Sequence, residues 1–87
     1  MTNYRIYTED LNRKDITALV SRYFKGFTVF TVTGYYKQCP ERSTIIEIMA
    51  ADNEAHIIRF IGKVIAQRNV LEGVIMTSEK IAAEFVS

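Results

Sequence analysis

The fold is decided by Phe27-Thr28-Val29-Phe30-Thr31-Val32-Thr33, a run in which every residue is β-branched or aromatic. Such side chains suit a pleated, half-buried surface, so the run predicts a β-strand. Its alternation gives the strand two faces: Phe27, Val29 and Thr31 on one, and Thr28, Phe30 and Val32 on the other.

A second strand is predicted at residues 44–50, Thr44-Ile45-Ile46-Glu47-Ile48-Met49-Ala50. Ile46, Ile48 and Ala50 share its buried face, and Glu47 points the other way. Residues 34–42 carry glycine, glutamine, proline and charges, which predicts a loop or hairpin connection between the two strands.

Working outward toward the N-terminus, residues 4–8 alternate around Ile6 and predict a short strand. A helix follows, capped by Asp10 or Asn12. Its apolar face has helical spacing and consists of Ile16, Leu19, Val20, Tyr23 and Phe24. Gly26 is expected to end this helix in a left-handed conformation.

Toward the C-terminus, Asp52 or Asn53 can cap a second helix. The apolar stripe of that helix consists of Ile57, Ile58, Ile61, Val64 and Ile65. Residues 70–77 predict a fourth strand, in which Gly73 suggests a bulge or a close backbone contact. Ser78 is expected to cap a last short helix, which carries Ile81, Ala82 and Phe85.

The predicted order is strand, helix, strand, strand, helix, strand. With right-handed crossovers, this order gives an α+β protein of the ferredoxin-like βαββαβ type. It has a four-stranded antiparallel sheet with two helices on one face, plus a short C-terminal helix. The chain has 87 residues, so residues 1–87 are expected to form a single domain.

Composition and charge narrow the function classes. The chain is 48% hydrophobic and 24% charged, which is typical of a globular protein and excludes a disordered segment. A net charge of +1 argues against a protein that mainly neutralises phosphates. Cys39 is the only cysteine, so no internal disulfide can form. Because neither a signal peptide nor a membrane span is recognised, a cytoplasmic location is expected.

The face of the sheet opposite the helices is predicted to carry apolar side chains, among them Tyr7, Phe30 and Val32. A monomer would leave this large apolar patch in water. Either the C-terminal helix covers the patch, or copies of the chain associate through it. We expect a homo-oligomer, a dimer or a trimer.

No catalytic constellation, metal site or cofactor motif is found. His56 could act as a general base, but no second group at a recognisable spacing accompanies it. Cys39 has no nearby histidine or helix N-terminus to activate its thiol. The absence of a glycine-rich phosphate loop argues against nucleotide hydrolysis.

Two stretches resemble the motifs of RNA-recognition domains. They are Ile6-Tyr7-Thr8-Glu9-Asp10-Leu11 and Lys25-Gly26-Phe27-Thr28-Val29-Phe30, in which Tyr7 and Phe27 would stack on bases. The second motif belongs on the third strand of such a domain, whereas here it falls on the second. Nucleic acid is therefore not expected as a partner.

The connection between the two central strands is the best candidate binding segment. It collects aromatic, cationic, anionic and hydroxyl groups, namely Tyr35, Tyr36, Lys37, Glu41, Arg42 and Ser43. Lys37 and Arg42 could hold a phosphate while a tyrosine stacks on a base. The alternative is a hairpin tip with solvated charges and with tyrosines that pack at a subunit contact.

Most of the chain resembles a group of small uncharacterised bacterial and phage proteins. The residues that carry this resemblance are Tyr7-Thr8-Glu9-Asp10, Phe24-Lys25-Gly26-Phe27-Thr28, Gly34-Tyr35-Tyr36, Glu41-Arg42-Ser43, Ile45-Ile46-Glu47-Ile48 and Asn69-Val70-Leu71. The resemblance implies a ferredoxin-like fold, similar in element order to the PII and CutA-type trimers. The nucleotide-loop signatures of PII are not recognised, and the group brings no assigned reaction.

These observations favour a non-enzymatic, homo-oligomeric binding protein. It would engage a small anionic metabolite, a nucleotide or a protein partner through residues 35–43. One alternative is a small ferredoxin-like oxygenase or isomerase, which requires His56 or a tyrosine to line a pocket between sheet and helices. The other is a single-stranded RNA-binding domain, which requires salt-sensitive binding.

Overall fold

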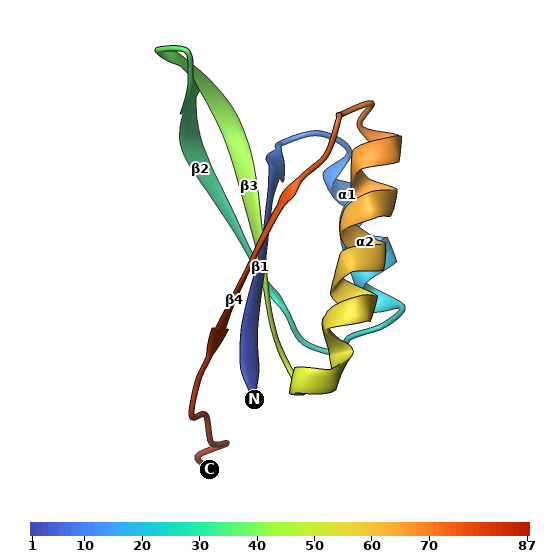
Figure 1. The fold of residues 1–87 in the computed structure, drawn as a ribbon, viewed down its shortest axis with the longest axis vertical. Helices are drawn as coiled ribbons and strands as arrows, with labels where there is room; N and C mark the ends of the chain where they lie inside the picture. Colours follow the sequence, from blue (N-terminus) through green and yellow to red (C-terminus); the bar gives the residue numbers. More distant parts are fainter.

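Four antiparallel strands form one sheet in the order β2-β3-β1-β4, and two helices pack on one of its faces (Figure 1). This computed structural model describes all residues, 1–87. The strands are β1 (Thr2–Glu9), β2 (Thr28–Tyr36), β3 (Cys39–Ala50) and β4 (Ile75–Lys80). The helices are α1 (Arg13–Ser21) and α2 (Ala55–Arg68), and a 3₁₀ turn, Asp52–Glu54, precedes α2. The predicted α+β, ferredoxin-like fold is confirmed.

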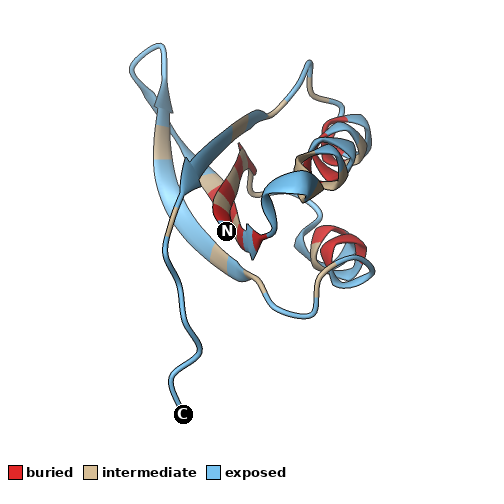
Figure 2. Cartoon of the chain, turned by 60° about the horizontal axis from the view of Figure 1, so that its bottom comes forward, coloured by how far each residue is buried: buried red, intermediate tan, exposed pale blue.

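The core lies between the sheet and the two helices. β1 and β3 are the central strands, and their alternate side chains are buried toward the helices, with Ile6 paired to Ile46 and Tyr4 to Ile48. From the other side, α1 contributes Ile16, Leu19 and Val20, and α2 contributes Ile58, Ile61 and Ile65. In Figure 2 burial is confined to the surfaces that face each other, while the β2–β3 tip and the C-terminal segment are exposed.

The first helix is shorter than predicted. It ends at Ser21, and Gly26 does not adopt a positive φ, so the prediction of a glycine cap is wrong. The Arg22 and Tyr23 amides donate to the carbonyls of Leu19 and Val20, which tightens the last turn and ends the helix before Gly26. Tyr23 is 45% exposed, and its ring packs edge-on against Phe60 of α2, with the ring centroids 6.0 Å apart.

The connection predicted at residues 34–42 is a hairpin, one of the two forms expected, but it is much shorter than predicted. β2 continues to Tyr36, β3 begins at Cys39, and the connection is a two-residue turn. Lys37 and Gln38 both have positive φ, 50° and 67°, as the tight turns that suit the twist of a hairpin require. Because β1 pairs with β3 only as far as Ser43, the strands beyond that point project as a two-stranded arm. The arm is visible at the top of Figure 1.

The C-terminal region also differs from the prediction. The fourth strand runs from Ile75 to Lys80, rather than over residues 70–77, and residues 81–87 form no helix. Ser78 pairs with Tyr4 inside the sheet, so it cannot cap a helix. The segment after Lys80 extends away from the body of the protein (Figure 1).

Neither helix has the length and the apolar character needed to cross a membrane.

Candidate functional site

The face of the sheet opposite the helices, which we call the open face, carries apolar side chains that no element covers. Phe30 and Val32 of β2 lie on it as predicted, 40% and 36% exposed, since their neighbour Val29 pairs with the buried Ile46. Tyr7 lies on it as well, beside Ile75 of β4, which is 67% exposed. Ile45 of β3 lies between β2 and β1 on the same face.

A charged pair interrupts this apolar surface near the middle of the sheet. Arg5 of β1 and Glu47 of β3 are register partners, and both Nε and Nη2 of Arg5 lie 2.8 Å from Glu47 Oε2. Asn3 donates to the same oxygen over 3.2 Å. The hydrogen bond from Asn3 and then that from Arg5 lower the pKa of Glu47, and Glu47 in turn raises the pKa of Arg5. The pair is therefore held ionised and fixed in place.

Toward the arm, the open face is hollowed by a shallow depression of about 540 Å³. Its lining is apolar and acidic, with Tyr7, Val32, Tyr36 and Ile75 beside the carboxylates of Glu9 and Glu41. The connection from α2 to β4 forms one wall, through Leu71, Gly73 and Val74. Such a hollow offers contact area to an apolar surface and no cation to an anion.

The six residues predicted as a binding site are divided between the two faces of the arm. Tyr36, Glu41 and Ser43 line the hollow on the open face. Tyr35 is paired with Pro40, one position out of phase with Tyr36, so it points to the opposite face. Lys37 stands in the turn, with its Nζ 5.4 Å from the centre of the Tyr36 ring.

Arg42, the remaining member of that set, is engaged in an ionic cluster on the helix side. Its Nη2 lies 3.1 Å from Oδ2 of Asp10, while Oδ1 of Asp10 accepts from Thr44 over 2.9 Å and from Arg13 over 3.0 Å. Arg13 also donates to Thr31 of β2. The Thr44 hydroxyl and then Arg13 lower the pKa of Asp10. The cluster ties the start of α1 to the base of the arm.

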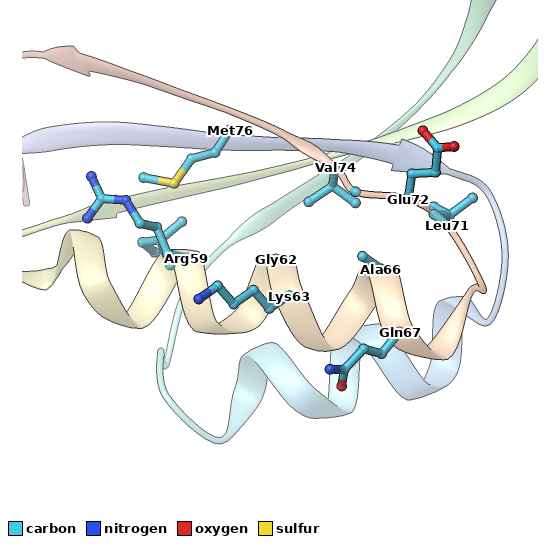
Figure 3. Close-up of a pocket in the computed structure, with 11 residues that line it drawn as sticks. Arg59, Gly62, Lys63, Ala66, Gln67, Leu71, Glu72, Val74 and Met76 are labelled. Atoms are coloured by element: carbon cyan, nitrogen blue, oxygen red, sulfur yellow. The ribbon is translucent and has the colours of Figure 1, made fainter.

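A second depression, of about 420 Å³, lies on the helix side, between α2 and the segment that leads into β4 (Figure 3). Gly62 and Ala66 of α2 face Val74 and Met76 across it, and Arg59 and Lys63 stand at its rim. A β-carbon on Gly62 would lie 3.1 Å from Cγ2 of Val74, so glycine lets the helix and this segment approach.

Neither group required by the enzyme alternative lines this depression. His56 is exposed on the first turn of α2, where its Nδ1 lies 3.1 Å from the Asn53 carbonyl oxygen. None of the tyrosines is among the lining residues. Cys39 is exposed at the start of β3, next to the turn.

The two aromatic residues proposed to stack on bases do not share a face. Tyr7 lies on the open face, whereas Phe27 precedes β2 and packs against the core on the helix side. The stacking platform that the RNA-binding alternative requires is therefore not formed by this pair.

Sequence reasoning missed Ile45, Ile75 and the Leu71–Val74 segment as parts of the open-face site. A signal for Ile45 was available, since it alternates with the buried Ile46 in a predicted strand. Ile75 lies within the strand predicted at residues 70–77, but its place on the open face follows only from the pairing of β4 with β1.

Comparisons with known proteins give a fold and no activity. No protein-family model matches the sequence, and no curated protein matches it at a significant level. Among solved structures, the chain is similar to that of a DUF3240 family protein from Shewanella baltica OS155, determined at 2.40 Å resolution. The match has a TM-score of 0.77 and 11% sequence identity, and it covers 99% of this chain and 94% of the other. At this identity the likeness establishes a shared small α+β fold.

Proposed function

We propose that this protein is a non-enzymatic, homo-oligomeric binding protein. Its binding surface is the open face together with the side of the β2–β3 arm that continues this face and lines the hollow. The observation that carries the proposal is the exposed row of Phe30, Val32 and Ile75 beside the hollow that Tyr36 lines. Exposed, contiguous apolar surface rimmed by polar groups is typical of an interaction site.

The chemistry of the hollow favours a protein partner over a small anion. Lys37 and Arg42 were the residues expected to hold a phosphate, yet neither lines the hollow, and Arg42 is paired with Asp10. The charged groups that do line it are Glu9 and Glu41. A partner with an apolar patch flanked by lysine or arginine matches this lining.

Tyr36 is the expected anchor of such a complex. It is 65% exposed, and large aromatic side chains contribute most of the binding energy at protein interfaces. Its position on the arm, beyond the end of β1, lets it reach a partner without a rearrangement of the core.

A matched pair of variants tests this proposal, because Tyr35 and Tyr36 are adjacent, similarly exposed at 73% and 65%, and on opposite faces of the arm. Tagged wild type, Tyr36→Ala and Tyr35→Ala are used to capture partners, which are quantified by mass spectrometry. We expect recovery of the specific partner to fall by about tenfold or more with Tyr36→Ala and to persist with Tyr35→Ala. Equal recovery with all three proteins would contradict the proposed surface.

Native mass spectrometry of the same preparations tests the homo-oligomer directly. A dimer or trimer supports the proposal, and a monomer at micromolar concentration contradicts it. A bound small anion that dissociates from the Arg42→Ala variant would instead favour the anion-binding role.

A further inference from the structure

β2 lies at the edge of the sheet, and its sequence does nothing to protect that edge. It pairs with β3 on one side and with no strand on the other. All nine of its residues are uncharged, and none is proline. Natural edge strands are usually short, charged, bulged or interrupted by proline, because unpaired N–H and C=O groups template pairing with another chain. The other edge strand, β4, has six residues and includes Glu79 and Lys80.

The turn at Lys37 and Gln38 determines which backbone groups of β2 face outward. In a two-residue hairpin, the flanking residues, here Tyr36 and Cys39, form a hydrogen-bonded pair. Tyr36 and every second residue before it therefore direct their N–H and C=O groups at β3. Val29, Thr31, Thr33 and Tyr35 direct theirs away from the sheet.

We propose that two copies of the chain pair antiparallel through their β2 edges, about a twofold axis beside Val32, and so join their sheets into one. This inference rests on the self-association in the proposed function and gives it a geometry. Val32 is the central residue of the strand, so this register pairs β2 along its whole length. Outward-facing residues then meet each other, with Thr31 opposite Thr33 of the second copy and Val29 opposite Tyr35.

The side chains are complementary in this register. On the open face, Phe30 lies opposite Gly34 of the second copy, where the missing side chain leaves room for the aromatic ring, a pairing that favours strand association. Thr31 and Thr33 can hydrogen-bond across the joint. Because the axis is twofold, each contact occurs twice. The joined sheet keeps its open face uncovered, so a dimer presents twice the open-face area of one copy to a partner.

Cysteine cross-linking tests the register, in a Cys39→Ser background that leaves no native thiol. At the axis the two copies of residue 32 form a non-hydrogen-bonded pair, with Cα atoms about 4.5 Å apart, which suits a disulfide. We expect Val32→Cys to give a covalent dimer as the main product of mild oxidation. Thr28→Cys, on the same strand, is the matched control, since its two copies are roughly 26 Å apart at about 3.3 Å per residue.

A charge at the axis gives an independent readout. Val32→Lys places two lysines opposite each other and is expected to convert the dimer to a folded monomer, as followed by native mass spectrometry and circular dichroism. Ile75→Lys, on the open face away from this edge, is expected to stay dimeric.

The outcomes separate this inference from the function it rests on. A wild-type dimer that Val32→Cys cross-links and Val32→Lys dissociates supports both. A trimer, or a dimer in which Val32→Cys does not cross-link above the Thr28→Cys level, overturns the β2 pairing and leaves self-association standing. A wild-type monomer overturns both.

Discussion

The backbone amide of Leu71 donates to the carbonyl oxygen of Ala66 over 2.8 Å, and this bond closes the C-terminal end of α2. A second bond, from the Val70 amide to the Gln67 carbonyl at 3.3 Å, completes the paired pattern of a Schellman cap. Such a cap requires a left-handed residue, and that position is held by Val70, with φ 55°. Glycine is usual there, and a β-branched residue is strained.

Val70→Gly is therefore expected to stabilise the fold by about 1 kcal/mol. The left-handed conformation costs an L-residue about 1–2 kcal/mol, and the extra freedom of glycine in the unfolded chain offsets about 0.5–1 kcal/mol of this. Because the Val70 side chain is 90% exposed, its removal loses little packing.

Urea unfolding measures this change in stability. Val70→Ala keeps the β-carbon and should stay within about 0.5 kcal/mol of wild type; an equal gain from both variants would show that strain is not the cause.

Strands β2 and β3 and the open face could be predicted because local pattern and burial agree there, although β2 lies at the edge of the sheet rather than at its centre. β-Branched and aromatic residues alternate over residues 27–33, and the structure buries one alternate set of the paired strand and exposes the other. α2 was predictable for the same reason, since Ile58, Ile61 and Ile65 recur at helical spacing and are fully buried.

The errors fall where tertiary pairing overrides local signals. Ser78 resembles a helix cap, but its pairing with Tyr4 draws it into the sheet. Lys37 and Gln38 carry no turn signature, so the sequence predicts a long connection where the structure has a two-residue turn, and the candidate binding residues do not form the single cluster expected. Tyr35 and Tyr36 lie on opposite faces because both belong to β2, and composition does not reveal that the strand continues so far.

The turn itself allows a second prediction. Gln38 has φ 67°, a conformation that glycine adopts without steric cost, so Gln38→Gly is expected to stabilise the protein by about 1 kcal/mol. The same substitution in a helix has the opposite sign, and Gln67→Gly in α2 should destabilise by about 0.5–1 kcal/mol. Thermal or urea unfolding of the two variants checks both signs. Destabilisation by Gln38→Gly would contradict the positive φ.

Acid should destabilise the protein, in part through Asp10. Its folded pKa lies below the ordinary value of 3.8, because the carboxylate accepts from Thr44 and Arg13. Its stabilising contribution is thus fully present above about pH 4 and is lost as the pH falls through the folded pKa. The pKa values of Glu47 and Asp52 are also lowered, so these carboxylates act in the same direction.

Asp10→Asn isolates that contribution. At neutral pH the variant should unfold at a lower urea concentration than wild type, and the two midpoints should converge at a pH below the folded pKa. Glu72→Gln removes an exposed carboxylate that makes no salt bridge and should leave the pH profile unchanged. If the difference between the unfolding midpoints of Asp10→Asn and wild type stays constant down to low pH, the loss of stability comes from the changed side-chain geometry and not from the lost charge.

Two isoleucines, one in the core and one on the open face, allow a further comparison. Ile61 is fully buried, so Ile61→Ala leaves a cavity and is expected to destabilise by about 2–5 kcal/mol, a large share of a small domain's stability. Ile75 is 67% exposed, and Ile75→Ala should cost about 0.5 kcal/mol or less. Similar losses from the two substitutions would mean that the open face is covered in the isolated protein.

A dye that binds exposed apolar surface should also detect the open face. Phe30 on the open face and Phe60 on the outer surface of α2 are matched at 40% and 48% exposure, but only Phe30 belongs to a contiguous apolar surface, with Val32, Ile45 and Ile75. Anilinonaphthalene sulfonate requires such a surface to bind and fluoresce. Phe30→Ser is therefore expected to reduce the fluorescence of the folded protein severalfold, and Phe60→Ser to leave it nearly unchanged. Circular dichroism confirms that both variants fold.

Because edge pairing through β2 leaves the open face uncovered, the difference in fluorescence between the two variants should persist in a dimer. Equal fluorescence from the two variants would mean that the open face is not the main apolar surface of the molecule.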